Sequence, residues 1–318
     1  MKRLSNVVTL VALLQLVCLL TSAYAEYPEK AIEYYIPFSA GGVADLSSRA
    51  LCTAAEKYLG QPFKMNFKTG AGGRLMVESL LKATPDGYTI GMVASGSLAR
   101  VPHMMKVTYD PFKDFTFIMQ FGVWEMGYAV KKEAPWNSLK DLVEYARKNP
   151  NKVTISCPGP KTPQDLATNY IAKIENIKLK SVPFKGGQEA VTALLGGHVT
   201  AACAIEFPRY IESGKIKLLA TLGSKRWYPD VPTLTELGYN LSLSSNVGII
   251  GPAGMSREVV TKLQDAFHKA MEDKGFISVM ADQSNPIHYR NAEEFAKVIR
   301  VEYDNWAKIM KELSIEKQ

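Results

Sequence analysis

The chain has 318 residues, of which 47% are hydrophobic and 22% charged, and its formal net charge is +7. This length fits two domains of ordinary size, and the composition excludes a disordered chain or a multi-span membrane protein. The basic excess is mild and scattered, with no run of five or more Lys and Arg residues. A nucleic acid is therefore a poor candidate partner.

The first 25 residues have the pattern of a secretory signal peptide. Lys2 and Arg3 form a basic region, residues 7–20 form an apolar region, and Ala23 and Ala25 occupy the two small-residue positions of a cleavage site. The apolar run is too short for a comfortable membrane span. We predict export, cleavage after Ala25, a charge reduced from +7 to +5 by loss of Lys2 and Arg3, and no stable membrane insertion after cleavage.

The mature chain begins with a strand, a glycine loop and a helix. Residues 32–38 are apolar and predict a buried strand, and the loop that follows contains Gly41 and Gly42. The next helix places Leu46, Ala50, Leu51, Ala54 and Ala55 on one face. Its start leaves backbone N–H groups unpaired, so an anionic group could dock on the backbone where glycines add no side chain. A tight turn that binds nothing is the alternative, and this stretch alone does not decide between them.

The same order of strand, loop and helix occurs twice more before residue 101. Strands are predicted over residues 62–67 and 88–93, and a helix over residues 74–83. The loops 68–73 and 94–97 are again rich in glycine and small polar residues. Three such units predict a parallel, doubly wound sheet, which binds ligands outside the carboxyl ends of its strands.

Two long apolar runs, residues 115–130 and 241–251, predict strands that cross between two domains. The region between them repeats the pattern of strands and helices, with a capping box at Ser138 and an N-cap at Thr162. Two amphipathic helices follow over residues 256–272 and 292–313. We therefore predict an α/β protein whose first domain contains 26–122 plus 247–318 and whose second contains 123–246.

Sequence motifs of common enzymes are absent. Four histidines lie on separate elements, and the three cysteines of the mature chain lack the spacing of metal ligands. Asp45, Asp165 and Glu206 could supply a pair of carboxylates, although helix capping explains each more simply. We expect no catalytic residue, no cofactor and no metal. Because triads assemble in space and not along the chain, an exported hydrolase or transferase is the alternative function.

Four loops place Gly, Ser or Thr at the start of a helix, and they span residues 39–42, 95–97, 156–162 and 185–187. An enzyme would need a nucleophile, an acid or a base among these groups, whereas a receptor needs only hydrogen-bond donors. The loops supply donors. They favour a protein that binds a small solute.

Several short sequence motifs occur in a specific order along the mature chain. They are Tyr27-Pro28-Glu29-Lys30, Ile36-Pro37-Phe38, Gly70-Ala71-Gly72-Gly73, Pro85-Asp86-Gly87-Tyr88, Tyr109-Asp110-Pro111, Val182-Pro183-Phe184-Lys185-Gly186-Gly187, Leu194-Leu195-Gly196-Gly197-His198-Val199, Asp230-Val231-Pro232-Thr233 and Gly251-Pro252-Ala253-Gly254. In the number, order and spacing of these motifs the chain resembles the tripartite tricarboxylate transporter substrate-binding proteins, the Bug-type periplasmic receptors.

This resemblance implies a fold and a function. The fold is the two-domain α/β fold of periplasmic binding proteins (Venus-flytrap, type II), with two crossing strands. The implied protein is periplasmic, performs no chemistry, and delivers a small organic acid to membrane transporter subunits. We expect a di- or tricarboxylate or an aromatic carboxylate as the ligand. A ligand-sensing receptor for a membrane sensor kinase would have the same sequence pattern and is a second alternative.

The resemblance also places the ligand. One carboxylate is expected on the loop Ser39–Gly42, which Asp45 would hold, and Ser95, Ser97 and Thr162 match further positions of the family's site. The complete expected set of ligand-binding residues is Phe38, Ser39, Ala40, Gly41, Gly42, Asp45, Ser95, Ser97, Ser156, Thr162, Lys185, Gly186 and Glu206.

The chain departs from the family pattern in the second domain. The segment 156–162 is one residue longer and carries Pro158 and Pro160, and residues 199–214 are about two residues shorter. We expect the prolines and Phe207 to form an apolar rim. Whether Arg100, Lys161 or Lys185 meets a second carboxylate, and whether Glu206 meets an amino or hydroxyl group, is open at this point.

Overall fold

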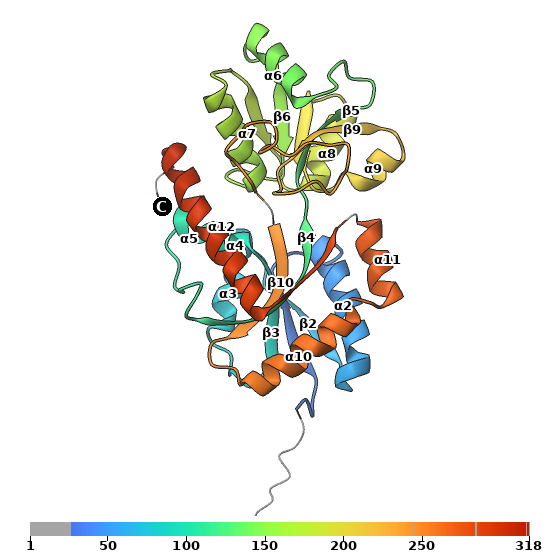
Figure 1. Cartoon of the computed structure of the whole chain (residues 1–318), viewed down its shortest axis with the longest axis vertical. Helices are drawn as coiled ribbons and strands as arrows, with labels where there is room; N and C mark the ends of the chain where they lie inside the picture. The colour runs from blue at the N-terminus through green and yellow to red at the C-terminus, as the bar shows by residue number, and fades with distance from the viewer. Residues whose placement is uncertain (1–26, 244, 284, 316, 318) are drawn as a thin grey trace, which may run out of the picture.

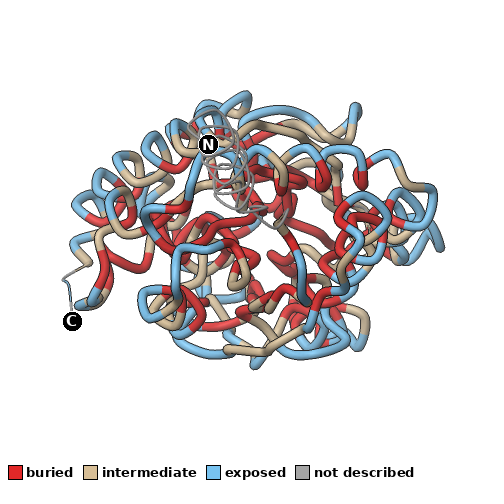
Figure 2. The backbone as a smooth tube through the Cα atoms, turned by 90° about the horizontal axis from the view of Figure 1, so that it is seen from below, coloured by how far each residue is buried: buried red, intermediate tan, exposed pale blue. Residues whose placement is uncertain are grey.

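The computed structural model describes residues 27–243, 245–283, 285–315 and 317, so the predicted signal peptide and its cleavage site lie outside the described residues. Two α/β lobes are stacked along the long axis, and β4 (Phe115–Trp124) and β10 (Ser245–Pro252) lead from one to the other (Figure 1). Seen from below, the buried segments of the backbone lie toward the inside and the exposed segments toward the outside (Figure 2). No described helix combines the length and the apolar character that crossing a bilayer requires.

Lobe 1 is built on a six-stranded sheet of order β11-β4-β10-β3-β1-β2. Its further elements are β1 (Ile32–Ile36), α2 (Val43–Leu59), β2 (Phe63–Phe67), η1 (Ala71–Gly73), α3 (Arg74–Leu80), β3 (Thr89–Ala94), α4 (Gly96–Ala99), α5 (Val101–Met104), α10 (Arg257–Ala270), α11 (Lys274–Asp282), β11 (Ile287–Asn291) and α12 (Ala292–Glu312). The parallel pairs β1–β2 and β1–β3 agree with the prediction.

Lobe 2 is built on a five-stranded sheet of order β7-β6-β8-β5-β9. Its elements are β5 (Gly127–Lys131), α6 (Leu139–Lys148), β6 (Thr154–Cys157), α7 (Pro163–Ile174), β7 (Lys180–Pro183), α8 (Gly187–Leu195), β8 (Ala201–Ala204), α9 (Pro208–Glu212) and β9 (Ile216–Thr221). The predicted capping box at Ser138 is present, and Thr162 caps α7.

Both sheets are mixed, whereas the first three strand–loop–helix units predicted a parallel sheet. β10 pairs antiparallel with β3 and β4, and β5 pairs antiparallel with β8 and β9. The crossings explain this difference, because β4 carries the chain out of lobe 1 and β10 must return in the opposite direction. The strands that alternate with helices keep their parallel pairing, so their carboxyl ends face the other lobe.

Helix α2 buries part of the predicted face, since Leu51, Ala54 and Ala55 are buried as predicted. Leu46 is 44% exposed, whereas Ser47, Ser48, Leu51 and Cys52 are buried. The close approach of α2 to α10 and α11 accounts for this choice, because small side chains fit where helices pack tightly. Leu46 therefore lies on the outer face of the lobe.

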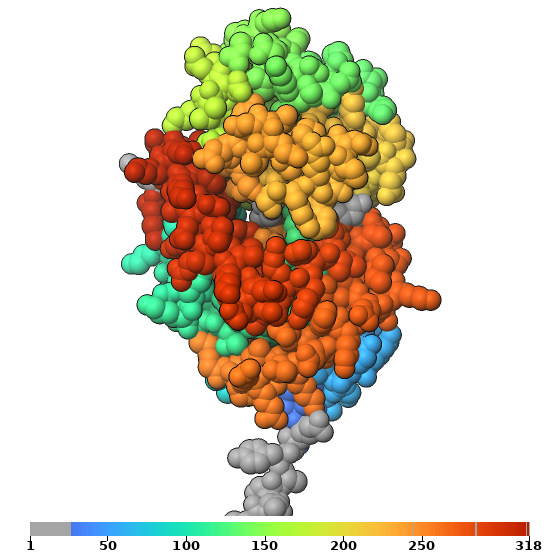
Figure 3. All heavy atoms as spheres, viewed as in Figure 1, coloured from blue at the N-terminus to red at the C-terminus, as the bar shows by residue number. Residues whose placement is uncertain are grey.

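Helix α12 joins the lobes. Its first half packs through Phe295 and Ile299 onto lobe 1, and its second half brings Trp306, Ile309 and Met310 into the core cluster that contains the strands of lobe 2. Lys173 Nζ of α7 also donates a hydrogen bond to the Glu312 carbonyl. In Figure 3, α12 and the segment that follows β9 lie side by side across the seam between the lobes.

Candidate functional site

A cleft of about 690 Å³ lies between the lobes. Its walls come from the loops that follow β1 and β3 in lobe 1 and β6, β7 and β8 in lobe 2, so each wall lies at the carboxyl ends of parallel strands. The crossing segments contribute Trp124, Met126 and Ser245 to its floor. The volume is within the range of roughly 300–1,000 Å³ that suits small-molecule sites.

The loop between β1 and α2 presents bare backbone to this cleft. Gly41 adopts a left-handed φ of +78°, and its N–H donates to Asp45 Oδ2 at 2.8 Å. Asp45 is itself held by Arg49, whose Nε lies 2.6 Å from Oδ1. Gly42 is the N-cap of α2, and no side chain caps this helix. The amides at the start of α2 therefore have no side-chain partner, and Val43 and Ala44 line the cleft.

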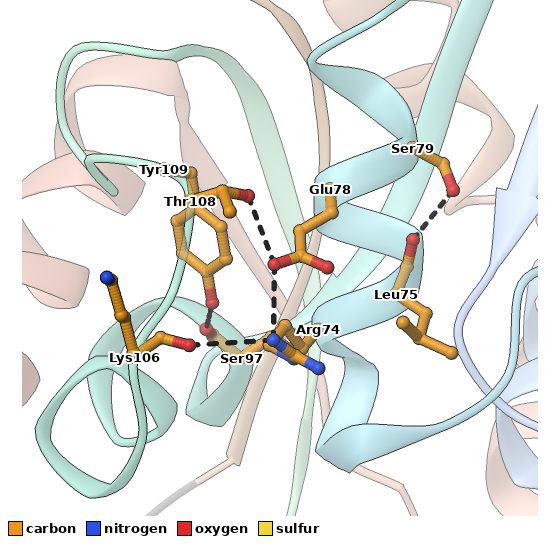
Figure 4. A network of polar contacts seen from close by, with 8 residues as sticks. All are labelled: Arg74, Leu75, Glu78, Ser79, Ser97, Lys106, Thr108 and Tyr109. Atoms are coloured by element: carbon orange, nitrogen blue, oxygen red, sulfur yellow. Dashed lines mark hydrogen bonds and ion pairs between the residues drawn. The ribbon is translucent and has the colours of Figure 1, made fainter. Parts of the chain in front are cut away.

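The loop between β3 and α4 contributes a second part of the lobe 1 wall. Ser97 lines the cleft, and its Oγ donates to the Gly72 carbonyl at 3.2 Å. Behind it, the Tyr109 hydroxyl donates to the Ser97 carbonyl at 2.5 Å, beside a cluster in which Glu78 accepts from Thr108 and pairs with Arg74 (Figure 4). These contacts fix α4 from its far side.

Lobe 2 presents side chains to the cleft together with the backbone of Gly186. Thr162 Oγ1 donates to the Gly159 carbonyl at 2.8 Å and accepts from Asp165 N–H at the start of α7. Lys185 is exposed beside Gly186, the N-cap of α8. Glu206 is half-buried against Gly187, where any side chain would collide with its carboxyl group. Burial raises the pKa of Glu206, although the N–H of Ile205 donates to Oε2 at 3.1 Å.

The structure brings most of the predicted ligand-binding residues to one cleft. Those that line it are Phe38, Ser39, Ala40, Gly41, Gly42, Ser97, Thr162, Lys185, Gly186 and Glu206. Asp45 stands behind the β1–α2 loop and holds it, as the hydrogen bond to Gly41 indicates.

Two predicted serines lie outside the cleft lining. Ser95 is fully buried, and its Oγ accepts a hydrogen bond from Asn246 N–H of β10 at 3.1 Å. Ser156 is also fully buried and donates to the Ala190 carbonyl of α8 at 2.8 Å. Both side chains tie together elements that carry the walls.

The apolar part of the cleft matches the predicted rim at Pro158, which lines the cleft, whereas Pro160 is not among the lining residues. Phe207 is buried in the core of lobe 2 and does not line the cleft. Phe38 and Trp124 instead form an aromatic pair with ring centroids 5.6 Å apart, and Met126 and Ile205 extend this surface. Trp124 and Met126 are two residues apart in an extended crossing segment, so strand alternation could have placed them on one face.

Few ionisable side chains line the cleft. Among its described lining residues, Glu206 is the one carboxylate, Arg100 and Lys185 are the cations, and no histidine or cysteine is present. No group of three or more His, Cys, Asp or Glu residues in the described ranges is placed to hold a metal ion. The cleft therefore has donors for an anion and little with which to exchange protons.

Comparison with known proteins gives consistent matches. A family described as "Tripartite tricarboxylate transporter family receptor" matches residues 48–315. The "UPF0065 protein in gbd 5'region" of Cupriavidus necator is 35% identical over 275 residues, which cover 86% of this chain and 84% of that protein.

Two solved structures share the architecture. The periplasmic binding protein BugD is 29% identical, with a TM-score of 0.77 over 92% of this chain and 100% of that one. R. palustris Rpa4515 with adipate is 23% identical, with a TM-score of 0.79 over 92% and 100% of the two chains, and this likeness concerns the fold. These matches confirm the predicted two-domain α/β fold.

Proposed function

This chain belongs to the tripartite tricarboxylate transporter receptor family, and on that premise we propose that it binds a small organic carboxylate in the cleft and delivers it to a membrane transporter. The observation that carries the proposal is the uncapped start of α2, where Gly41 and Gly42 leave the backbone open to the cleft. Backbone N–H groups and the positive end of the helix dipole together bind an anionic group.

The charges of the cleft support an anionic ligand. Arg100 and Lys185 outnumber the single carboxylate of Glu206 among the described lining residues. The apolar surface of Phe38, Trp124 and Met126 suits the hydrocarbon body of such an acid. A di- or tricarboxylate or an aromatic carboxylate fits this combination.

The composition of the cleft also supports a receptor over an enzyme. General acid–base or nucleophilic catalysis needs a base beside an acid or nucleophile. Glu206 has no second carboxylate, histidine or cysteine beside it among the described lining residues, and Asp45 and Asp165 each hold a loop. We therefore propose that the bound acid leaves unchanged.

We further propose that the chain works in the periplasm after cleavage that follows Ala25. Its first domain would contain residues 26–122 plus 247–318, and its second residues 123–246.

The two domains would close on the ligand by a hinge near Phe121–Gly127 and Leu243–Gly248, where β4 runs into β5 and β10 returns. Small-angle scattering should then show a smaller radius of gyration with ligand, and an unchanged radius with a saturating ligand would contradict the hinge.

A thermal-shift screen tests the function. The mature protein is heated with C4–C6 dicarboxylates, adipate among them, with tricarboxylates and with aromatic acids, each beside its neutral amide. We expect a rise in melting temperature for at least one acid and none for its neutral amide.

The stabilising acid is then incubated with the protein, and consumption of the acid would overturn the receptor assignment. Uptake of that acid by cells with and without the gene separates transport from sensing.

A further inference from the structure

Arg100 is the residue directly after α4, and its side chain lies in the cleft wall of lobe 1. It packs over the backbone of two glycines. A Cβ atom on Gly72 would lie 3.5 Å from Nη2, and one on Gly96 would lie 3.6 Å from Nε. The absence of side chains at Gly72 and Gly96 therefore leaves room for the guanidinium group against the backbone.

The partners of this guanidinium are neutral. Nη1 donates to the Lys161 carbonyl at 2.8 Å and contacts Met104 Sδ at 3.1 Å. The Nε–H is buried without a hydrogen-bond partner, and no described carboxylate forms an ion pair with Arg100. Burial lowers the pKa of Arg100 to about 10, so the side chain stays charged at neutral pH. A shielded cation without an anion is an unfavourable arrangement unless a ligand completes it.

Both hydrogen bonds of Arg100 use Nη1, and its Cζ lies 5.9 Å from the centroid of the Trp306 ring. Because Nε is buried, Nη2 is the guanidinium nitrogen left to donate a charge-assisted hydrogen bond to a ligand carboxylate. The only other cation of the described lining, Lys185, is exposed on the opposite lobe. Arg100 shares lobe 1 with the start of α2, so the two anion-binding positions stay fixed relative to each other.

We infer that Arg100 binds a second carboxylate of the ligand and makes this protein selective for dicarboxylates. The inference rests on the proposed function, which assigns the first carboxylate to the start of α2. A monocarboxylate would leave Arg100 without an anion, whereas a dicarboxylate satisfies both positions.

A purely structural role is the competing explanation. The Arg100–Lys161 bond joins lobe 1 to the loop before α7, where Lys161 has a left-handed φ of +58° and its N–H is held by Asp165. If Arg100 only ties the lobes together, its loss should weaken every ligand by the same factor. A selectivity measurement therefore separates the two roles.

The experiment measures calorimetric dissociation constants for the strongest binder among succinate, malate, glutarate and adipate and for the monoamide of that same acid. We expect wild type to bind the diacid at least about tenfold more tightly, which is the contribution of one charge-assisted hydrogen bond. Arg100→Gln should bring the diacid down to the affinity of the monoamide while the monoamide changes by less than about threefold. Arg100→Lys, which keeps the charge, should retain part of the preference. Arg257→Gln, at an exposed position of α10, should behave as wild type.

Equal losses of diacid and monoamide in Arg100→Gln would overturn the inference and leave Arg100 as a contact between the lobes. A wild-type protein that binds acids without preferring the diacid would also overturn it, while the proposed function stands. If wild type binds none of these acids or the wider acid panel, the proposed function fails and the inference falls with it. The Arg100→Lys variant keeps the test decisive if Arg100→Gln does not fold.

Discussion

The two walls of the cleft recognise a ligand in different ways. Lobe 1 offers the start of α2, where no side chain caps the backbone amides of Val43 and Ala44, and one cation at Arg100. Lobe 2 offers the side chains of Thr162, Lys185 and Glu206. Backbone amides donate to any carboxylate, whereas side chains differ in charge, length and reach. The first wall should therefore set the class of ligand, and the second should select among members of that class.

The largest effect is expected when the backbone wall is blocked. Gly42→Val places a branched side chain over the amides of α2 and should weaken binding of every carboxylate by about a hundredfold or more, since two charge-assisted hydrogen bonds are lost. Gly42 has a φ of −84°, and a Cβ there would meet only the Ser39 carbonyl at 3.4 Å, so the fold should tolerate the change. Calorimetry on the folded variant measures the loss.

Ala253→Val is the matched control for this variant, because Ala253 is exposed in a lobe 1 loop outside the cleft lining. It should bind as wild type. If Gly42→Val folds and binds acids normally, the β1–α2 loop is only a turn, and the contrast between the walls disappears.

A smaller effect is expected in lobe 2. Glu206→Gln removes the one carboxylate of the described lining, so a dicarboxylate should bind roughly several-fold more tightly at pH 7.5. Burial raises the pKa of Glu206 above its ordinary value, while nearby Arg209 opposes the shift. Wild type should therefore bind anions more tightly as the pH falls through this raised pKa, because protonation removes the repelling charge.

The pH dependence of calorimetric affinity distinguishes the variant. Glu206→Gln should lose that part of the pH dependence, whereas Glu212→Gln, at an exposed position of α9, should retain it. Weaker binding by Glu206→Gln would contradict repulsion. It would mean that Glu206 accepts a hydrogen bond from an amino or hydroxyl group of the ligand.

The smallest effect on binding is expected between the walls, at Glu125 of the first crossing. Its Oε1 accepts from Gly223 N–H at 2.9 Å, and burial raises its pKa to about 8. Because the folded-state pKa lies above the unfolded value, this group stabilises the fold at low pH, and that contribution is lost as the pH rises through about 8.

From about pH 6 to about pH 9, the free energy of unfolding of wild type should fall by roughly 2 kcal/mol more than that of Glu125→Gln. Ligand affinity should change little. Urea unfolding at both pH values measures the difference. Glu144→Gln, at an exposed position of α6, should follow wild type. A slope of stability against pH that is identical in wild type and Glu125→Gln would show that Glu125 does not carry the buried proton.

Much of the backbone wall could be predicted from the sequence because its chemistry is local. Gly41, Gly42 and Asp45 lie within five residues, and the hydrogen bond that shapes the loop joins residues four apart. The capping box at Ser138 and the N-cap at Thr162 are also local, and both are present. The crossings could be predicted for a similar reason, because long apolar runs interrupt the pattern of shorter strands.

Other parts of both walls depend on contacts that sequence spacing does not encode. Ser95 and Ser97 are two residues apart, yet Ser97 faces the cleft and Ser95 bonds to Asn246 of a strand that returns from lobe 2. Ser156 turns inward because the Ala190 carbonyl of α8 is within reach. Phe207 enters the lobe 2 core. In each case, a partner distant in sequence decides the direction of the side chain.

If the start of α2 receives a carboxylate, the backbone amides of Val43 and Ala44 report on it directly. Titration of the 15N-labelled mature protein with a bound acid, followed by transverse-relaxation-optimised NMR, measures their proton shifts. We predict that these amides move downfield on binding, as new hydrogen bonds to a carboxylate require, and that the acid's neutral amide leaves them in place. Tight binding of the acid with the Val43 and Ala44 amides unmoved, and with shifts confined to lobe 2, would show that the start of α2 does not receive the carboxylate.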